Sequence, residues 1–98
     1  MVRVHNDRGA VLAAVTIDAG VRPGVVVLPV GAWYDPLVPG DPRSMCVHGN
    51  PNVLTSNRPA SGLSQAPAAQ SCLVEVERWT GAVPPVRAHE PPRFVPGP

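Results

Sequence analysis

Short apolar stretches separated by turn residues set the pattern of this chain. Residues 2–4 alternate Val-Arg-Val, and Asn6-Asp7-Arg8-Gly9 leads into a mostly apolar run at Val11–Ile17. Strand side chains alternate between two faces, and Asn, Asp and Gly tolerate turn geometry, with Gly9 free to take positive φ. The pattern therefore predicts a β-hairpin whose second arm ends at Asp18-Ala19-Gly20.

Two further apolar segments are strand candidates. A turn at Val21-Arg22-Pro23-Gly24 precedes Val25–Leu28, which is apolar on both faces, as in strands inside a barrel or between layers. Cys72–Glu77 alternates apolar residues with glutamates, which indicates a half-exposed closing strand. Helical patterns are weak throughout because prolines interrupt them. The fold class is therefore predicted to be mainly β.

Prolines and glycines divide the rest of the chain into long loops. Asp35-Pro36, residues 38–42 and Asn50-Pro51 break any regular element within a few residues. Such loops are uncommon in compact domains unless they are functional or disordered. From Gly81 onward, prolines predict an extended C-terminal tail at 81–98.

Composition and charge remove several function classes. The chain has 98 residues, 14 of them Pro and 9 Gly, which allows one domain at most. The net charge is +1, and the 8 cations are all arginines scattered singly. A nucleic-acid-binding surface would cluster its cations or interleave them with aromatics, so no nucleic-acid partner is expected. The longest apolar run is about half of what a membrane-spanning helix needs, so no membrane span is expected.

No familiar catalytic motif is present in the sequence. The G-x-S-x-G, H-E-x-x-H and C-x-x-C patterns are absent, and neither phosphate-binding glycine motif occurs. A small hydrolase using Cys46 and His48 remains an alternative that requires a thiol with a lowered pKa. His5, His48, His89 and Cys46 include no local ligand pair, so no metal site is predicted. Cys46 and Cys72 are expected to be small buried hydrophobes.

The polar loop at Cys46–Thr55 is the strongest candidate for a binding site. Asn50 and Asn52 carry amides that offer a donor and an acceptor together, which suits a purine edge. The Asp35 carboxylate is able to accept two hydrogen bonds from guanine, and backbone amides at 49–52 suit an anion. Taken singly, each residue is more typical of ordinary turn chemistry. Their convergence favours a polar ligand.

Together, these residues resemble the C-terminal cofactor-binding domain of the molybdopterin oxidoreductases, in the branch of dimethyl sulfoxide, trimethylamine N-oxide and biotin sulfoxide reductases. The resemblance covers nearly the whole chain, over Val2–Gly9, Val21–Val26, Gly31–Pro36, Cys46–Thr55, Ser61–Pro67, Cys72–Val76 and Pro84–Ala88. It implies a partial double-psi β-barrel of the aspartate decarboxylase-like kind at 1–80, followed by the tail at 81–98. Its implied cofactor is bis(molybdopterin guanine dinucleotide), which carries molybdenum.

The resemblance also implies which residues face the cofactor. They lie in three loops and are Trp33, Tyr34, Asp35, His48, Gly49, Asn50, Asn52 and Gln65. Asp35 and Asn52 are assigned to hydrogen bonds with guanine or the pterin, and Gln65 to a position behind them. No catalytic residue and no metal ligand is expected, because the domains that carry them are absent from the chain.

The family's barrel begins before Met1, so an N-terminally truncated barrel without turnover of its own is expected. Its partners would be the cofactor and the remainder of a reductase, in the same or a separate chain. One alternative is a split subunit that completes a separately encoded catalytic chain. Another is a vestigial β module that binds nothing. Both the cytoplasm and the periplasm stay open as compartments.

Overall fold

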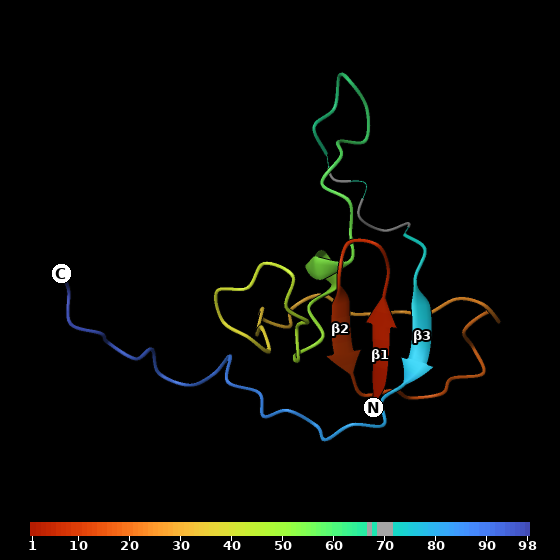
Figure 1. Cartoon of the computed structure of the whole chain (residues 1–98). Helices are drawn as coiled ribbons and strands as arrows, with labels where there is room; N and C mark the ends of the chain where they lie inside the picture. The colour runs from red at the N-terminus through yellow and green to blue at the C-terminus, as the bar shows by residue number, and fades with distance from the viewer. Residues whose placement is uncertain (67, 69–71) are drawn as a thin grey trace.

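The computed structural model describes residues 1–66, 68 and 72–98. Within them, a small open sheet is formed by β1 (Val2–His5), β2 (Ala10–Ala13) and β3 (Glu75–Arg78) in the order β2-β1-β3, as Figure 1 shows. Both pairings are antiparallel. The one helical element of the described residues is the 3-10 turn η1 (Pro51–Val53). The mainly β prediction is therefore confirmed, and the sheet formed by the described residues is open. Residues 67 and 69–71 of the predicted barrel region lie outside the described residues.

The predicted hairpin is formed by β1 and β2. His5 pairs with Ala10, and the Asn6 N–H donates to the Gly9 carbonyl at 3.0 Å. The Asn6 side chain accepts from the Arg8 amide and donates to the Leu54 carbonyl at 2.9 Å, so it ties the hairpin turn to the loop behind η1. These side-chain bonds fix the turn because Asn bonds its own neighbouring backbone readily.

A glycine is required at position 9 because a larger side chain would not fit there, and not because of its backbone conformation. Its φ is not positive, contrary to the freedom expected from the sequence. A Cβ at this position would lie 2.6 Å from Val53 Cγ1 and 3.1 Å from the Val53 carbonyl oxygen. The hairpin turn therefore packs directly against η1.

The second arm of the hairpin is shorter than predicted. It was expected to reach Ile17, but β2 ends at Ala13. The reason is the register: Ala13 pairs with Val2, the first residue of β1, so the residues after Ala13 lie beyond the end of their partner strand. Val15 and Ile17 are exposed as a result. The turn at Asp18–Gly20 is confirmed, with the Gly20 N–H donating to Asp18 Oδ1 at 2.8 Å.

Val25–Leu28 is not the buried strand that its composition predicted. The preceding turn is confirmed: the Val25 N–H donates to the Arg22 carbonyl at 3.1 Å, and Gly24 has φ +81°. After this turn, however, no strand pairs with the backbone within the described residues, and Val25, Val26 and Val27 stay exposed. Apolar side chains alone do not make a strand when the backbone N–H and C=O groups lack a partner.

The closing strand is confirmed near its predicted place. β3 begins at Glu75 rather than Cys72, and Val76 pairs with Val4 while Glu77 pairs with Arg3. All four residues of β3 are exposed, Val76 at 45%, so the strand is confirmed but the covered apolar face expected from the alternation is not.

A small core lies between the hairpin and the Cys46 loop. Cys46, fully buried, runs beside β2: its N–H donates to Ala10 and its carbonyl accepts from Leu12. It packs with Val4, Val11 and Leu54. The prediction of a buried hydrophobe is therefore confirmed for Cys46. It is wrong for Cys72, which is exposed because it precedes β3 outside this core.

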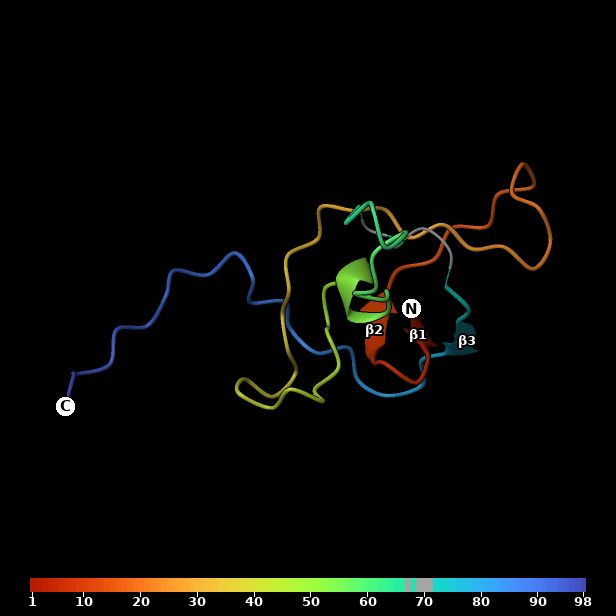
Figure 2. The same cartoon turned by 90° about the horizontal axis from the view of Figure 1, so that it is seen from above.

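The loops and the tail extend well beyond the sheet. The radius of gyration is 15.6 Å, above the roughly 13 Å typical of a compact domain of about 100 residues. Residues 15–24, the loop around residues 57–66 and the end of the tail each extend away from the sheet, as Figures 1 and 2 show. In the described residues, no helix has the length and apolar character needed to cross a membrane.

Candidate functional site

The backbone around Cys46 brings two distant loops together. The Leu37 N–H donates to the Met45 carbonyl, and the Val47 N–H donates to the Asp35 carbonyl, both at 2.8 Å. The Asp35 N–H points to the Cys46 sulfur at 3.5 Å. Residues 35–37 therefore run beside residues 45–47, which in turn run beside β2. This ladder places the Trp33 loop next to His48.

Gly49 lets the polar loop turn sharply at the end of β2. It is buried and has φ +76°, a conformation that side chains with a Cβ rarely adopt. A Cβ here would lie 3.4 Å from the Leu12 carbonyl oxygen and 3.7 Å from the Ala13 Cβ. The loop therefore approaches the strand closely, and His48 is held beside it.

The hydrogen bond of His48 fixes which of its ring nitrogens is free. Nδ1 lies 3.1 Å from the Trp33 carbonyl oxygen. A carbonyl oxygen only accepts, so Nδ1 carries the proton in this contact. In the neutral ring Nε2 is then an acceptor, available to an N–H group of a ligand.

Three rings gather at this point, and we call Trp33, His48 and His89 the ring cluster. The His48 and His89 centroids are 5.0 Å apart with the rings at 88°, and those of Trp33 and His89 are 5.6 Å apart at 39°. Trp33 is 64% exposed, so much of its indole is open to solvent. Edge-to-face and tilted pairs of this kind are favourable arrangements for aromatic rings.

Asp35 holds the C-terminal tail against these loops. It is only 7% exposed. Its Oδ2 accepts hydrogen bonds from the backbone N–H groups of Arg87 and Ala88, at 2.5 and 2.9 Å. This contact places His89 in the ring cluster. Sequence reasoning did not include His89 in the site, and no local signal marks it, because the contact joins residues 52 and 53 positions apart.

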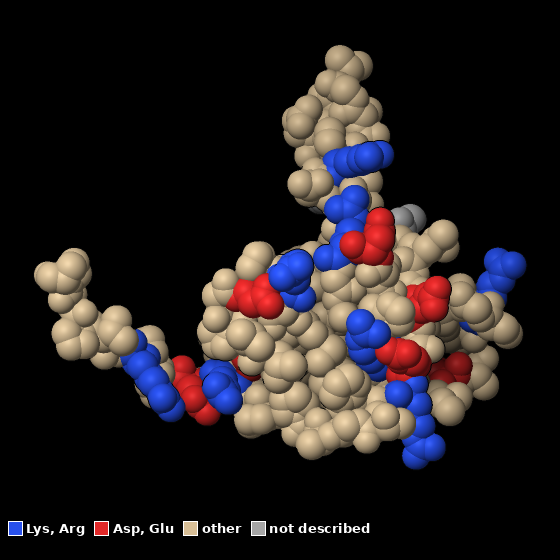
Figure 3. Space-filling view, viewed as in Figure 1, with Lys and Arg blue, Asp and Glu red and all other residues tan. Residues whose placement is uncertain are grey.

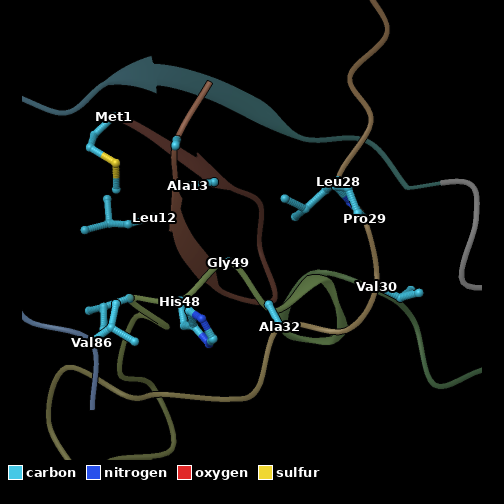
Figure 4. Close-up of a pocket in the computed structure, with 12 residues that line it drawn as sticks. Met1, Leu12, Ala13, Leu28, Pro29, Val30, Ala32, His48, Gly49 and Val86 are labelled. Atoms are coloured by element: carbon cyan, nitrogen blue, oxygen red, sulfur yellow. The ribbon is translucent and has the colours of Figure 1, made fainter. Parts of the chain in front are cut away.

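His48 and Gly49 also line an apolar hollow of about 430 Å³. In Figure 4 the His48 ring lies near Val86 and Ala32, with Met1 and Leu12 on the side of the strands. The complete lining consists of Met1, Leu12, Ala13, Ala14, Leu28, Pro29, Val30, Ala32, Val47, His48, Gly49 and Val86. The ring cluster therefore stands at the edge of a concave apolar surface.

Asn52 lies at a second hollow, of about 490 Å³, which shares Leu28 and Val30 with the first. Its backbone N–H donates to Asn50 Oδ1 at 2.9 Å, which caps η1. Among the described residues the Asn52 side chain forms no hydrogen bond and is exposed. The side-chain oxygen of Asn50 is thus used in the turn, whereas the Asn52 side chain has no partner among the described residues and is available to a ligand.

The predicted site residues are therefore only partly assembled. The structure brings Trp33, Asp35, His48 and Gly49 together, and Asn50 and Asn52 follow on the same loop. Tyr34 is half exposed beside them. Gln65 lies in the loop that projects away from the sheet in Figure 1, and that loop is closed by the Ala60 N–H donating to the Ala66 carbonyl.

The positions of Cys46 and His48 do not suit a cysteine hydrolase. The Cys46 thiol is fully buried, and His48 bonds the Trp33 carbonyl rather than the sulfur. His5 lies on β1 with Nε2 3.8 Å from Glu77, away from the ring cluster. Within the described ranges, no group of three or more His, Cys, Asp or Glu side chains is placed to hold a metal ion.

Charges of both signs are mixed over the surface. On the face shown in Figure 3, arginines stand next to acidic residues rather than forming one basic area. On the sheet, Arg3 Nη1 lies 2.6 Å from Glu77 Oε1. This hydrogen bond with the Arg3 guanidinium lowers the pKa of Glu77 below its ordinary value of 4.5.

Comparison with known proteins gives a consistent result. Residues 1–73 match the family described as "Molydopterin dinucleotide binding domain". The chain is 46% identical over 92 residues to the trimethylamine-N-oxide reductase of Salmonella typhi, covering 94% of the chain and 11% of that reductase. It is 47% identical over 83 residues to trimethylamine-N-oxide reductase 1 of Escherichia coli K12, covering 85% and 10% respectively. For the trimethylamine-N-oxide reductase of Haemophilus influenzae the identity is 36% over 96 residues, or 97% and 12%. The chain thus spans about a tenth of the length of these relatives.

Proposed function

The chain belongs to the molybdopterin dinucleotide-binding domain family, and from this we propose that it holds part of a bis(molybdopterin guanine dinucleotide) cofactor. It would do so as the C-terminal portion of a molybdenum reductase acting on S-oxides or N-oxides, without turnover of its own. The family match over residues 1–73 carries this proposal, because it includes every loop assigned to the cofactor from the sequence.

The chemistry of the described residues fits such a cofactor. Guanine and pterins are flat rings with N–H groups and carbonyls along their edges. The exposed indole of Trp33 offers a flat apolar surface, and the His48 Nε2 offers an acceptor beside it. The free side-chain amide of Asn52 offers a donor and an acceptor together.

The role of this chain is binding and orientation. When bound, the cofactor supplies oxygen-atom and electron transfer through its molybdenum. In our proposal the Cys46 ladder and Gly49 hold the polar loop rigidly, and His48 and Asn52 fix the edges of the heterocycles. Tyr34 and Asn50 border the same surface, and Gln65 would join it only if its loop folds back over the site.

We further propose that the sheet is part of a double-psi β-barrel, at residues 1–80. The outer edge of β3 has no partner strand among the described residues, and the apolar side chains of Val25–Val27 are exposed. Unpaired edges and exposed apolar surface favour pairing with further strands. These strands would come from the remainder of the reductase, in the same or a separate chain.

Cofactor retention tests the proposal. The full 98-residue chain would be purified from cells that make the cofactor, and the bound pterin and GMP released and quantified. We expect both in equal amounts, and less of both in Trp33→Ala and Asn52→Ala but not in the exposed control Asn57→Ala. Pterin that appears only with a co-purifying catalytic chain would support the split subunit. Absence of pterin and GMP in every preparation would support the vestigial module and overturn our proposal.

A further inference from the structure

The C-terminal tail consists of two parts that behave differently. Residues 86–89 lie against the loops of the site, and the Glu90 N–H donates to the Arg87 carbonyl at 2.8 Å to close a turn. We call residues 86–90 the tail turn. After it, the chain runs away from the sheet in both Figure 1 and Figure 2, and the side chains of Phe94 and Val95 are exposed.

A buried carboxylate is an unusual means of holding a tail. Burial of Asp35 removes water from a charged group, which costs free energy unless hydrogen bonds replace that water. The replacement comes from two successive backbone N–H groups of the tail turn, at Arg87 and Ala88. Hydrogen bonds to a charged acceptor are stronger than those between neutral groups. The tail turn is therefore attached to the Trp33 loop through its backbone, so its side chains are not used in this attachment and are available for other contacts.

The attachment places two side chains of the tail turn at the site. Val86 lines the same hollow as His48 and Gly49. His89 stands against both Trp33 and His48, yet remains exposed. A flat ligand lying on the indole of Trp33 would therefore meet the imidazole of His89 as well.

We propose that His89 is a ligand-contacting residue of the cofactor site, and that Asp35 is the positioning residue that holds it there. The ligand class is a planar hydrogen-bonding heterocycle, for which we take the guanine of a guanine nucleotide. This inference rests on the proposed function and extends the site beyond the matched residues 1–73. It gives Asp35 a role different from the direct reading of guanine expected from the sequence, because its Oδ2 is occupied by the tail turn.

The test is a titration of the full chain with GMP, followed by Trp33 fluorescence. Trp79→Phe is introduced in every protein so that Trp33 is the only tryptophan. We expect His89→Ala to weaken GMP binding about tenfold, the order expected for loss of a ring contact to a base. His89→Phe should restore binding to within about threefold. Phe94→Ala, beyond the tail turn, should leave the affinity unchanged.

A double-substitution cycle separates positioning from direct contact. If Asp35 acts through His89, then Asp35→Ala, His89→Ala and the double variant weaken GMP binding equally, and all retain the same preference for GMP over AMP. If Asp35 reads guanine itself, the two losses multiply and Asp35→Ala lowers that preference. The second result overturns the role that we assign to Asp35.

Two truncated chains test the tail turn without changing Asp35, in case the Asp35 variant does not fold. A chain ending at Glu90 keeps the tail turn and should bind GMP as the full chain does. A chain ending at Pro85 loses it and should bind about tenfold more weakly. If the two truncated chains bind GMP equally well, the inference is overturned while the proposed function stays intact. The same holds if His89→Ala binds GMP as tightly as the parent. Absence of GMP and pterin binding in the unsubstituted chain overturns both.

Discussion

The hairpin and the segment Val25–Val27 are built from similar residues, but the valines of the hairpin are largely covered whereas those of the second segment are exposed. In β1 and β2, Val4 and Val11 are buried and belong to the core. In the second segment, Val26 and Val27 are 54% and 71% exposed. The difference lies in the backbone, because β1 and β2 pair with each other whereas Val25–Val30 pairs with no strand among the described residues. Burial here follows from available hydrogen-bond partners rather than from side-chain type.

The largest test of this comparison is truncation of a side chain in each region. Leu12→Ala removes a side chain that is 1% exposed, and we expect it to lower the free energy of unfolding by about 2–5 kcal/mol. Val27→Ala should change it by no more than about 0.5 kcal/mol, since its side chain is already in water. Urea unfolding of the full chain measures both. Equal losses would show that Val27 is buried in solution and that the two regions do not differ.

Glycines give a second, smaller contrast. Gly9→Ala places a Cβ 2.6 Å from Val53 Cγ1, so we expect a loss of about 1–3 kcal/mol. Gly24→Ala meets no atom but must adopt φ +81°, and we expect about 1–2 kcal/mol. Gly62→Ala, with open space and no positive φ, is the control and should be neutral or slightly stabilising. Thermal unfolding ranks the three. A ranking with Gly24 first would mean that the hairpin turn relaxes away from η1.

The tail turn is intermediate between the paired hairpin and the unpaired valine segment, because a side chain holds its backbone. The tail turn has no strand partner, yet the Arg87 and Ala88 amides bond Asp35. We expect Asp35→Ala to speed hydrogen exchange of these two amides about tenfold or more, because their acceptor is lost. Asp41→Ala removes a local acceptor of the Arg43 amide and serves as the control. Unchanged exchange at residues 87 and 88 would contradict the attachment.

The smallest effect is expected at the exposed cross-strand pair of β1 and β3. The pKa of Glu77 is lowered below 4.5 in the folded chain, mainly by its hydrogen bond with Arg3. A carboxyl group whose pKa is lowered in the folded state stabilises the fold at pH values above 4.5. This contribution is lost as the pH falls through the folded-state pKa. We therefore expect Glu77→Gln to reduce the loss of thermal stability between about pH 5 and 3. Identical pH profiles of the parent and Glu77→Gln would show that the Arg3–Glu77 pair contributes nothing to stability.

Local signals explain what the sequence predicted correctly. The hairpin was predictable because Val2–Val4 alternates and Asn6 and Gly9 lie between its arms. The turn at Pro23-Gly24 was predictable because Pro fixes one φ and Gly accepts a positive one. The closing strand followed from the alternation around Val76. In each case the residues that decide the structure lie within a few positions of one another.

Features that depend on distant partners were missed. Val25–Leu28 has the composition of a strand, but the sequence does not state whether another strand lies beside it. Cys72 is exposed because of where β3 begins, which its own residue type does not encode. Trp33 and His48, both expected to face the cofactor, lie in loops that contact each other, and their role in binding stays a prediction. His89 was missed because only the folded chain brings it to them.

The pairing of β1 with β3 has a consequence for synthesis on the ribosome. About 70 residues separate His5 from Glu75, so at roughly 5–20 residues per second β3 is made about 4 to 14 s after β1. During that interval β1 and β2 are available to pair with each other, while the other edge of β1 has no partner strand. An open strand edge pairs readily with other chains. The edge of β1 in the nascent hairpin therefore stays open until Val76 is available to pair with Val4.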